Sequence, residues 1–141
     1  MNQLELKIIF QGKFKSNANI DKICKKLGLK SITPLWGEDP ENLIREEIGL
    51  GFEIIVTGVF ADGFDKSWLG RKIDEKCVED LKKMNQKFGV HISGEGGEYE
   101  SSVLSGPIFE RKIVIADYQT VWENSTNSGY MVVSQAMLSD K

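Results

Sequence analysis

The sequence predicts an α/β fold that begins with a parallel sheet and continues into an α+β part with mixed or antiparallel strands. Two observations carry this prediction. Over residues 4–60, strand-type and helix-type apolar patterns alternate in the order β-α-β-α-β, which favours parallel strands joined by right-handed crossovers. After about residue 90, apolar segments follow one another without helical patterns between them, which favours antiparallel or mixed pairing.

Apolar spacing defines the first strand and helix. A strand near residues 6–10 is predicted by the alternation of Leu4, Leu6, Ile8 and Phe10. A helix follows, with Asn19 as its N-cap and Gly28 as the glycine that ends it. The residues with helical spacing on its core face are Ile20, Ile23, Cys24 and Leu27. Residues 31–36 then form a short extended run.

A second helix and a central strand come next. Asp39 as a cap, Pro40 in the first turn and Glu41 beside the helix dipole predict a helix start. The apolar face of this helix is Leu43, Ile44 and Ile48, and Gly49 or Gly51 ends it. Residues 52–60 are almost continuously apolar, as in strands covered on both faces. We expect the strands near 6–10, 31–35 and 53–59 to join one parallel sheet.

The second half of the chain contains a third helix and three extended segments. The helix starts near Asp74 and stops at Gly89. Its predicted inner side consists of Cys77, Val78, Leu81, Met84, Asn85 and Phe88. A strand with a glycine-rich turn is predicted over 90–99, and further strands over 111–116 and 130–137.

Composition excludes several classes of protein. Of 141 residues, 40% are hydrophobic, so the chain is not a disordered polar segment. The net charge of −3 and the pI of about 5.3 exclude a general basic footprint, so no direct nucleic-acid partner is expected. The start of the sequence does not resemble a signal peptide, and no apolar run is long enough to span a membrane. Two widely spaced cysteines favour a reducing, cytoplasmic location.

The most unusual segment is residues 94–100, with the sequence GEGGEYE, which we call the acidic loop. It combines flexible glycines with carboxylates, and this pattern is suited to presenting acids to an amine, a cation or Mg²⁺. An exposed hairpin turn is the structural alternative. The segment fits neither a dinucleotide fingerprint nor a phosphate-binding P-loop.

A second cluster surrounds Trp68, in a glycine-flanked loop after the predicted central strand. Trp36 and Gly37 follow the preceding predicted strand in the same way. Ligands bind α/β sheets outside the carboxyl ends of the strands, so both loops are candidate binding segments. The alternative is that both tryptophans fill the core. His91 is the sole histidine, and one histidine does not make a metal site, so no metal ligands are predicted.

Together these segments resemble the diphthine–ammonia ligase family of the N-type ATP pyrophosphatase superfamily. The resemblance runs from about Leu27 to Val133 and rests on Trp36-Gly37, residues 67–71 with Asp74, and the acidic loop followed by Val103-Leu104 and Pro107. On the family's map, residues 1–38 are the remnant of a Rossmann-like nucleotide-binding domain. Residues 39–141 are the substrate-recognition domain.

The resemblance implies ATP-dependent amidation of diphthine, a modified histidine on translation elongation factor 2, through an acyl-adenylate that ammonia attacks. ATP and Mg²⁺ are the implied cofactors. The implied catalytic residues are Glu95, Glu98 and Glu100. The implied substrate-binding residues are Trp36, Gly37, Trp68, Leu69, Gly70, Arg71, Asp74, Gly94, Gly96, Gly97 and Tyr99. Diphthine carries a trimethylammonium group, for which the aromatic residues offer π-faces.

Departures from the family pattern concern nucleotide binding. The family's Ser-Gly-Gly-x-Asp-Ser phosphate loop does not occur in this sequence. The family's Tyr-Gln-Arg segment is also missing from residues Ser16 to Asp21. In addition, Ser101 stands where the family usually has threonine, and Ser105 where it usually has aspartate. We therefore expect the chain alone not to bind ATP tightly. Three hypotheses remain: a ligase subunit that works with a separate nucleotide-binding chain, a non-catalytic relative that kept substrate binding, and a fragment without function.

Two geometric expectations follow. Missing N-terminal strands would leave an uncovered sheet edge or apolar face, which predicts a homo-oligomer. The carboxylates of the acidic loop should surround one cleft together with Trp68 and Asp74, and Arg71 should pair with one of them.

Overall fold

The computed structural model of the chain describes residues 18–32 and 34–141. The chain divides into two compact units, residues 1–38 and 39–141, each of which is described by itself. In the first unit, α1 (Ala18–Lys26) ends as predicted, with Gly28 at a φ of +67°. The predicted strand near 6–10 lies outside the described residues. The strand predicted near 31–35 is wrong, because residues 34–37 form a turn and residues 31 and 32 are irregular.

Burial on α1 differs in part from the predicted core face. Cys24 is buried, as expected for a core residue, but Ile23 and Leu27 are 57% and 66% exposed. In the described part of this unit α1 is the only helix or strand.

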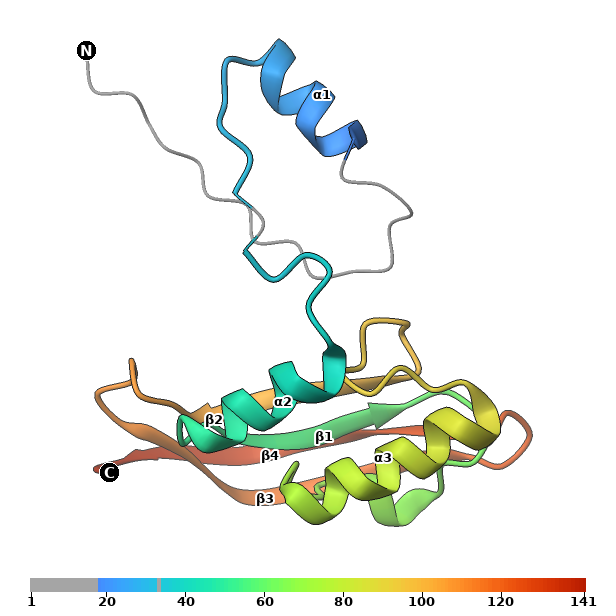
Figure 1. The fold of residues 1–141 in the computed structure, drawn as a ribbon. Coiled ribbons are helices and arrows are strands. Elements are labelled where there is room, and N and C mark those ends of the chain that lie inside the picture. Colours follow the sequence, from blue (N-terminus) through green and yellow to red (C-terminus); the bar gives the residue numbers. More distant parts are fainter. Residues whose placement is uncertain (1–17, 33) are drawn as a thin grey trace. The chain divides into compact units, whose positions relative to one another are not determined.

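The second unit is a four-stranded antiparallel sheet with helices on one face (Figure 1). The strand order is β2-β1-β4-β3. The strands are β1 (Glu53–Val59), β2 (Tyr99–Ser105), β3 (Lys112–Glu123) and β4 (Ser128–Ser139). The helices are α2 (Pro40–Gly49), the 3₁₀ turn η1 (Lys66–Trp68) and α3 (Glu75–Phe88). The α/β class and the antiparallel pairing of the later strands are therefore confirmed.

The predicted parallel sheet is wrong for residues 53–59. β1 pairs antiparallel with β2 along its length and with β4 at Gly58 and Val59. The remaining part of the second edge is occupied by the returning chain, where the Val56 amide donates to Arg71 O (2.9 Å) and the Ile73 amide to Ile54 O (2.8 Å). Burial on both faces was predicted correctly, but a continuous apolar run does not fix the direction of its neighbours.

Both helix starts of this unit form as predicted. The side chain of Asp39 accepts from the Asn42 amide (2.9 Å), and that of Asp74 accepts from the Cys77 amide (2.8 Å). Gly89 ends α3 at a φ of +73°. These are local interactions between residues three or four positions apart, which is why the sequence alone predicts them.

Two details of the later elements need correction. On α3, Asn85 and Phe88 are exposed instead of buried, and the Asn85 amide donates to Val90 O (2.9 Å) beyond the helix. The glycine-rich turn predicted within 90–99 is confirmed, because residues 92–98 form turns and bends, but the strand predicted there is wrong and starts only at Tyr99. Three glycines within 94–97 interrupt the extended pattern there.

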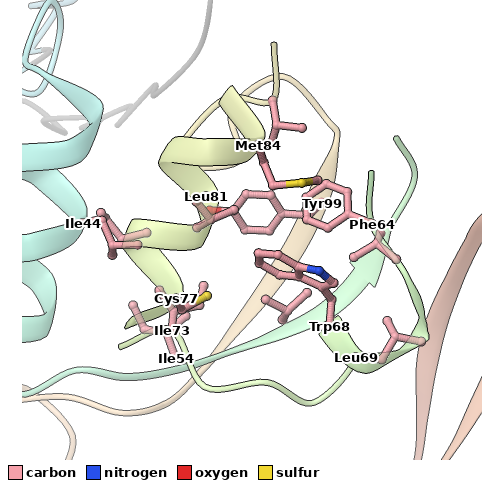
Figure 2. Packing of buried hydrophobic residues seen from close by; sticks show 14 residues of the cluster. Ile44, Ile54, Phe64, Trp68, Leu69, Ile73, Cys77, Leu81, Met84 and Tyr99 are labelled. Carbon is pink, nitrogen blue, oxygen red and sulfur yellow. The ribbon is translucent and has the colours of Figure 1, made fainter. Parts of the chain in front are cut away.

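The core lies between the helices and the sheet (Figure 2). Leu81 and Met84 of α3 face the aromatic rings of Phe64, Trp68 and Tyr99. Phe64 is 1% exposed, and its ring centroid lies 4.9 Å from that of Trp68 and 6.0 Å from that of Tyr99. This aromatic row links the loop after β1 to the start of β2.

The β3–β4 hairpin is much more exposed than the core. On β4 the neighbouring residues Val132 and Val133 are 45% and 43% exposed, and Met137 and Leu138 are 51% and 55% exposed. Neighbouring strand residues point to opposite faces, so this stretch is open on both faces. Among the described helices, none is long and apolar enough to cross a membrane.

Candidate functional site

The acidic loop lies beside the end of β1. The backbone oxygen of Glu98 accepts from the Phe60 amide (2.8 Å), just beyond β1. Within the loop, the Gly97 amide donates to Gly94 O (3.3 Å), and both glycines have φ values near +80° (+81° and +75°). Few residues other than glycine adopt this conformation without strain, so the glycines of the motif set the path of the loop.

The side chains of His91 and Tyr99 also hold the acidic loop, through hydrogen bonds. The ring Nδ1 of His91 accepts from the Glu95 amide (3.4 Å) and lies 3.2 Å from Ser93 Oγ. The Tyr99 hydroxyl donates to Ile92 O (2.7 Å). Tyr99 is only 3% exposed, and burial raises the pKa of its hydroxyl well above the usual range, so the phenol remains a protonated donor.

Glu98 turns its carboxylate inward over the loop. Its Oε1 accepts from the His91 amide (3.3 Å). Its Oε2 is buried and has no hydrogen-bond partner in the described part of the chain. Gly96 makes room for this carboxylate, because a Cβ at Gly96 would stand 2.2 Å from Oε1. A buried carboxylate oxygen without a donor is costly, so this atom is a position at which a donating or cationic ligand would be stabilised.

Glu95 adds a second acid to this region. Burial raises its pKa, and the negative charge of Glu47 on α2 raises it further. The pKa of Glu47 is itself raised by burial and by Glu46. The sequence analysis missed Glu47, although its position four residues after Leu43 and three after Ile44 places this carboxylate on the apolar face of the predicted helix.

Glu100 and Ser105 occupy different surroundings on β2. Glu100 is exposed and lies opposite Gly58 of β1. Ser105, which departs from the family pattern, is buried opposite Glu53 at the far end of β2 from the acidic loop. The replacement of the family's aspartate by Ser105 therefore lies away from the acidic loop.

The loop around Trp68 is built as a packing element. Trp68 is 7% exposed, and the Arg71 guanidinium lies 4.5 Å from the centroid of its ring. Arg71 pairs with Asp80 of α3 (2.6 Å), so the expected pair between Arg71 and the acidic loop is wrong. Arg71 and Lys83 hold the pKa of Asp80 at about 2. Leu69 is also buried.

The structure joins the two predicted segments through Phe64, which contacts the rings of both Trp68 and Tyr99. Sequence analysis missed Phe64, whose only signal was a single aromatic residue in a polar, glycine-containing loop. Asp74 is exposed and serves as the cap of α3. Trp36, half-buried, and Gly37, at a φ of +84°, belong to the unit of residues 1–38.

Comparison with known proteins identifies the family. The sequence model described as the diphthamide synthase C-terminal domain matches residues 39–138. The chain belongs to this family. Both the acidic loop and the Trp68 loop of this diphthamide synthase C-terminal domain lie within the matched residues.

Curated relatives of this diphthamide synthase domain carry the name diphthine–ammonia ligase. The protein from Schizosaccharomyces pombe is 38% identical over 122 residues, which cover 86% of this chain and 20% of that protein. The rat protein is 38% identical over 103 residues, 72% of this chain and 38% of that protein. The mouse protein is 33% identical over 126 residues, 86% of this chain and 47% of that protein. The chain thus spans less than half the length of each of these relatives.

Proposed function

We propose that this chain is the substrate-recognition part of a diphthine–ammonia ligase, which converts the carboxylate of diphthine on translation elongation factor 2 to an amide. Membership of the diphthamide synthase C-terminal domain family supports this proposal. The observation that carries it is the buried, unpartnered Oε2 of Glu98 inside a complete acidic loop. An elongation factor as substrate would place the reaction in the cytoplasm.

The acids fit the proton chemistry of amidation. Attack of ammonia on an activated carboxyl forms a C–N bond, releases the activating group and leaves a proton on nitrogen. A carboxylate near this nitrogen can accept a proton from ammonium before attack or from the adduct after it. Glu98 offers a free oxygen, and the raised pKa of Glu95 brings that group closer to neutral pH, where a general base is most effective.

We propose that ATP and Mg²⁺, the cofactors implied by the family, are held outside the described residues of this chain. In residues 18–32 and 34–141 no three His, Cys, Asp or Glu side chains are grouped so as to hold a metal ion. The sequence also lacks the phosphate loop of the family. In this proposal a separate part or chain binds the nucleotide, and residues 1–38 are the end of that Rossmann-like part.

Reconstitution tests the proposed function. The full chain would be mixed with the part of the rat relative that lies outside the matched region, together with ATP, Mg²⁺, ammonium and diphthine-bearing elongation factor 2. Mass spectrometry of the factor should show the carboxamide only when both protein parts are present. The control is the same rat fragment with its own C-terminal region. If that control is active and the mixture with this chain is not, the chain is a non-catalytic binding relative.

We also propose that copies of the chain self-associate through β4. This strand contains no charged residue over Ser128–Ser139, and its apolar side chains are exposed on both faces. Sedimentation at high micromolar concentration should give a dimer or larger species, and Met137→Lys should shift it to monomer. Ile108→Lys, at an 84% exposed loop position, is the control and should not. A wild-type monomer would contradict this proposal.

A further inference from the structure

A pocket of about 330 Å³ lies at the other end of the sheet from the acidic loop. It is lined by Ile55 of β1, Leu104 of β2, Ile113 of β3 and Met131 of β4, so its walls are largely apolar. The acidic loop enters the sheet at the start of β2, whereas Leu104 is near the end of this seven-residue strand. A strand of that length spans about 20 Å, which separates the two places.

Three polar residues are among those that line this pocket: Glu53, Lys112 and Tyr118. Glu53 and Lys112 also line a neighbouring pocket of about 240 Å³. Glu53 and Lys112 are half-buried, and within residues 39–141 neither makes a hydrogen bond or ion pair through its side chain. Tyr118 is 45% exposed, and its hydroxyl has no hydrogen-bond partner in the same residues. The pocket lining therefore includes an acidic residue, a basic residue and a phenol whose side chains have no partner within residues 39–141.

The absence of a side chain at Gly70 makes room for the Tyr118 hydroxyl. A Cβ at Gly70 would stand 3.2 Å from the Tyr118 hydroxyl oxygen and 3.7 Å from the Met131 sulfur. Gly70 also has a φ of +82°, which disfavours any side chain at this position. Gly70 thus faces this pocket, although it is part of the loop around Trp68.

We propose that this pocket binds a free aliphatic α-amino acid. The amino group would face the Glu53 carboxylate and the ring of Tyr118, the carboxylate would face Lys112, and the side chain would fill the apolar walls. Separate charges of opposite sign in a largely apolar pocket are best compensated by one ligand that carries both. Binding pockets for small molecules start at about 300 Å³, so a pocket of this size suits a small molecule and not a polymer.

The charges give the proposal a sharp test with the full chain. L-leucine would be the probe, and its analogues 4-methylpentanoate and 3-methylbutylamine each lack one charge. Amide NMR titration, followed at Gly70, should give a dissociation constant for leucine at least about tenfold below that of either analogue. Equal affinities for all three compounds, or no change at Gly70 with leucine, would overturn the proposal.

Matched variants locate the two charges. Glu53→Gln should weaken leucine binding at least about tenfold and leave 4-methylpentanoate binding unchanged, and Lys112→Met should weaken leucine and leave 3-methylbutylamine unchanged. Glu110→Gln, an exposed change outside the pocket, should bind leucine as wild type does. The amide spectrum of each variant reports folding in the same experiment. Wild-type leucine affinity in both folded pocket variants would refute the assignment. Because no step uses the acidic loop or amidation, failure here leaves the proposed ligase function standing.

Discussion

Glu98→Gln should lower the rate of amidation in the reconstituted enzyme by about 100-fold or more. The amide oxygen of glutamine can still accept from the His91 amide, as Oε1 does now, so the loop keeps this hydrogen bond. What is lost is the negative charge on the unpartnered Oε2, which is the group proposed to accept a proton or to hold the ammonium.

Folding of the Glu98 variant should be unaffected, because in the described residues the lost charge has no cationic partner. We expect its free energy of unfolding in urea to be no more than about 0.5 kcal/mol below that of wild type, because a buried carboxylate oxygen without a donor is itself costly. Glu110→Gln is the control for a conservative change at an exposed glutamate and should keep the full rate. A fully active Glu98→Gln enzyme would mean that the inward carboxylate only shapes the loop.

The fold shows which features a single sequence determines. Caps at Asp39 and Asp74 and the helix end at Gly89 were predicted because each depends on neighbours within one turn. The direction of strand pairing around residues 53–59 was not predicted, because it depends on where segments distant in the sequence return to the sheet. Here the chain from Gly70 to Ile73 returns along the edge of β1, where a parallel strand was expected.

The candidate site shows the same division. The composition of the acidic loop alone marks it as a candidate site, and its glycines take left-handed conformations at Gly94 and Gly97. The inward turn of Glu98 depends on space above Gly96 and on the His91 amide, which a pattern of residue types does not encode. The expectation that the loop carboxylates, Trp68 and Asp74 surround one cleft stays a prediction.

Phe64→Ala should lower the free energy of unfolding by about 3–5 kcal/mol, the usual cost of removing a buried aromatic ring. Phe64 is 1% exposed, and its ring contacts both Trp68 and Tyr99. The cavity would open beside two rings that are themselves buried, so the surrounding side chains have little freedom to fill it. Urea unfolding followed by far-UV circular dichroism measures the effect.

The same substitution tests whether the aromatic row supports the acidic loop. Ile108→Ala removes an apolar side chain that is 84% exposed and should change the free energy of unfolding by no more than about 0.5 kcal/mol. The milder substitution Phe64→Leu keeps most of the volume of the Phe64 side chain, but it removes the aromatic ring that contacts Tyr99. Amide exchange at His91, whose N–H donates to Glu98, should then become faster while exchange in α3 stays near wild type. Unchanged exchange at His91 in Phe64→Leu would show that Tyr99 and its hydroxyl hold the loop without help from Phe64.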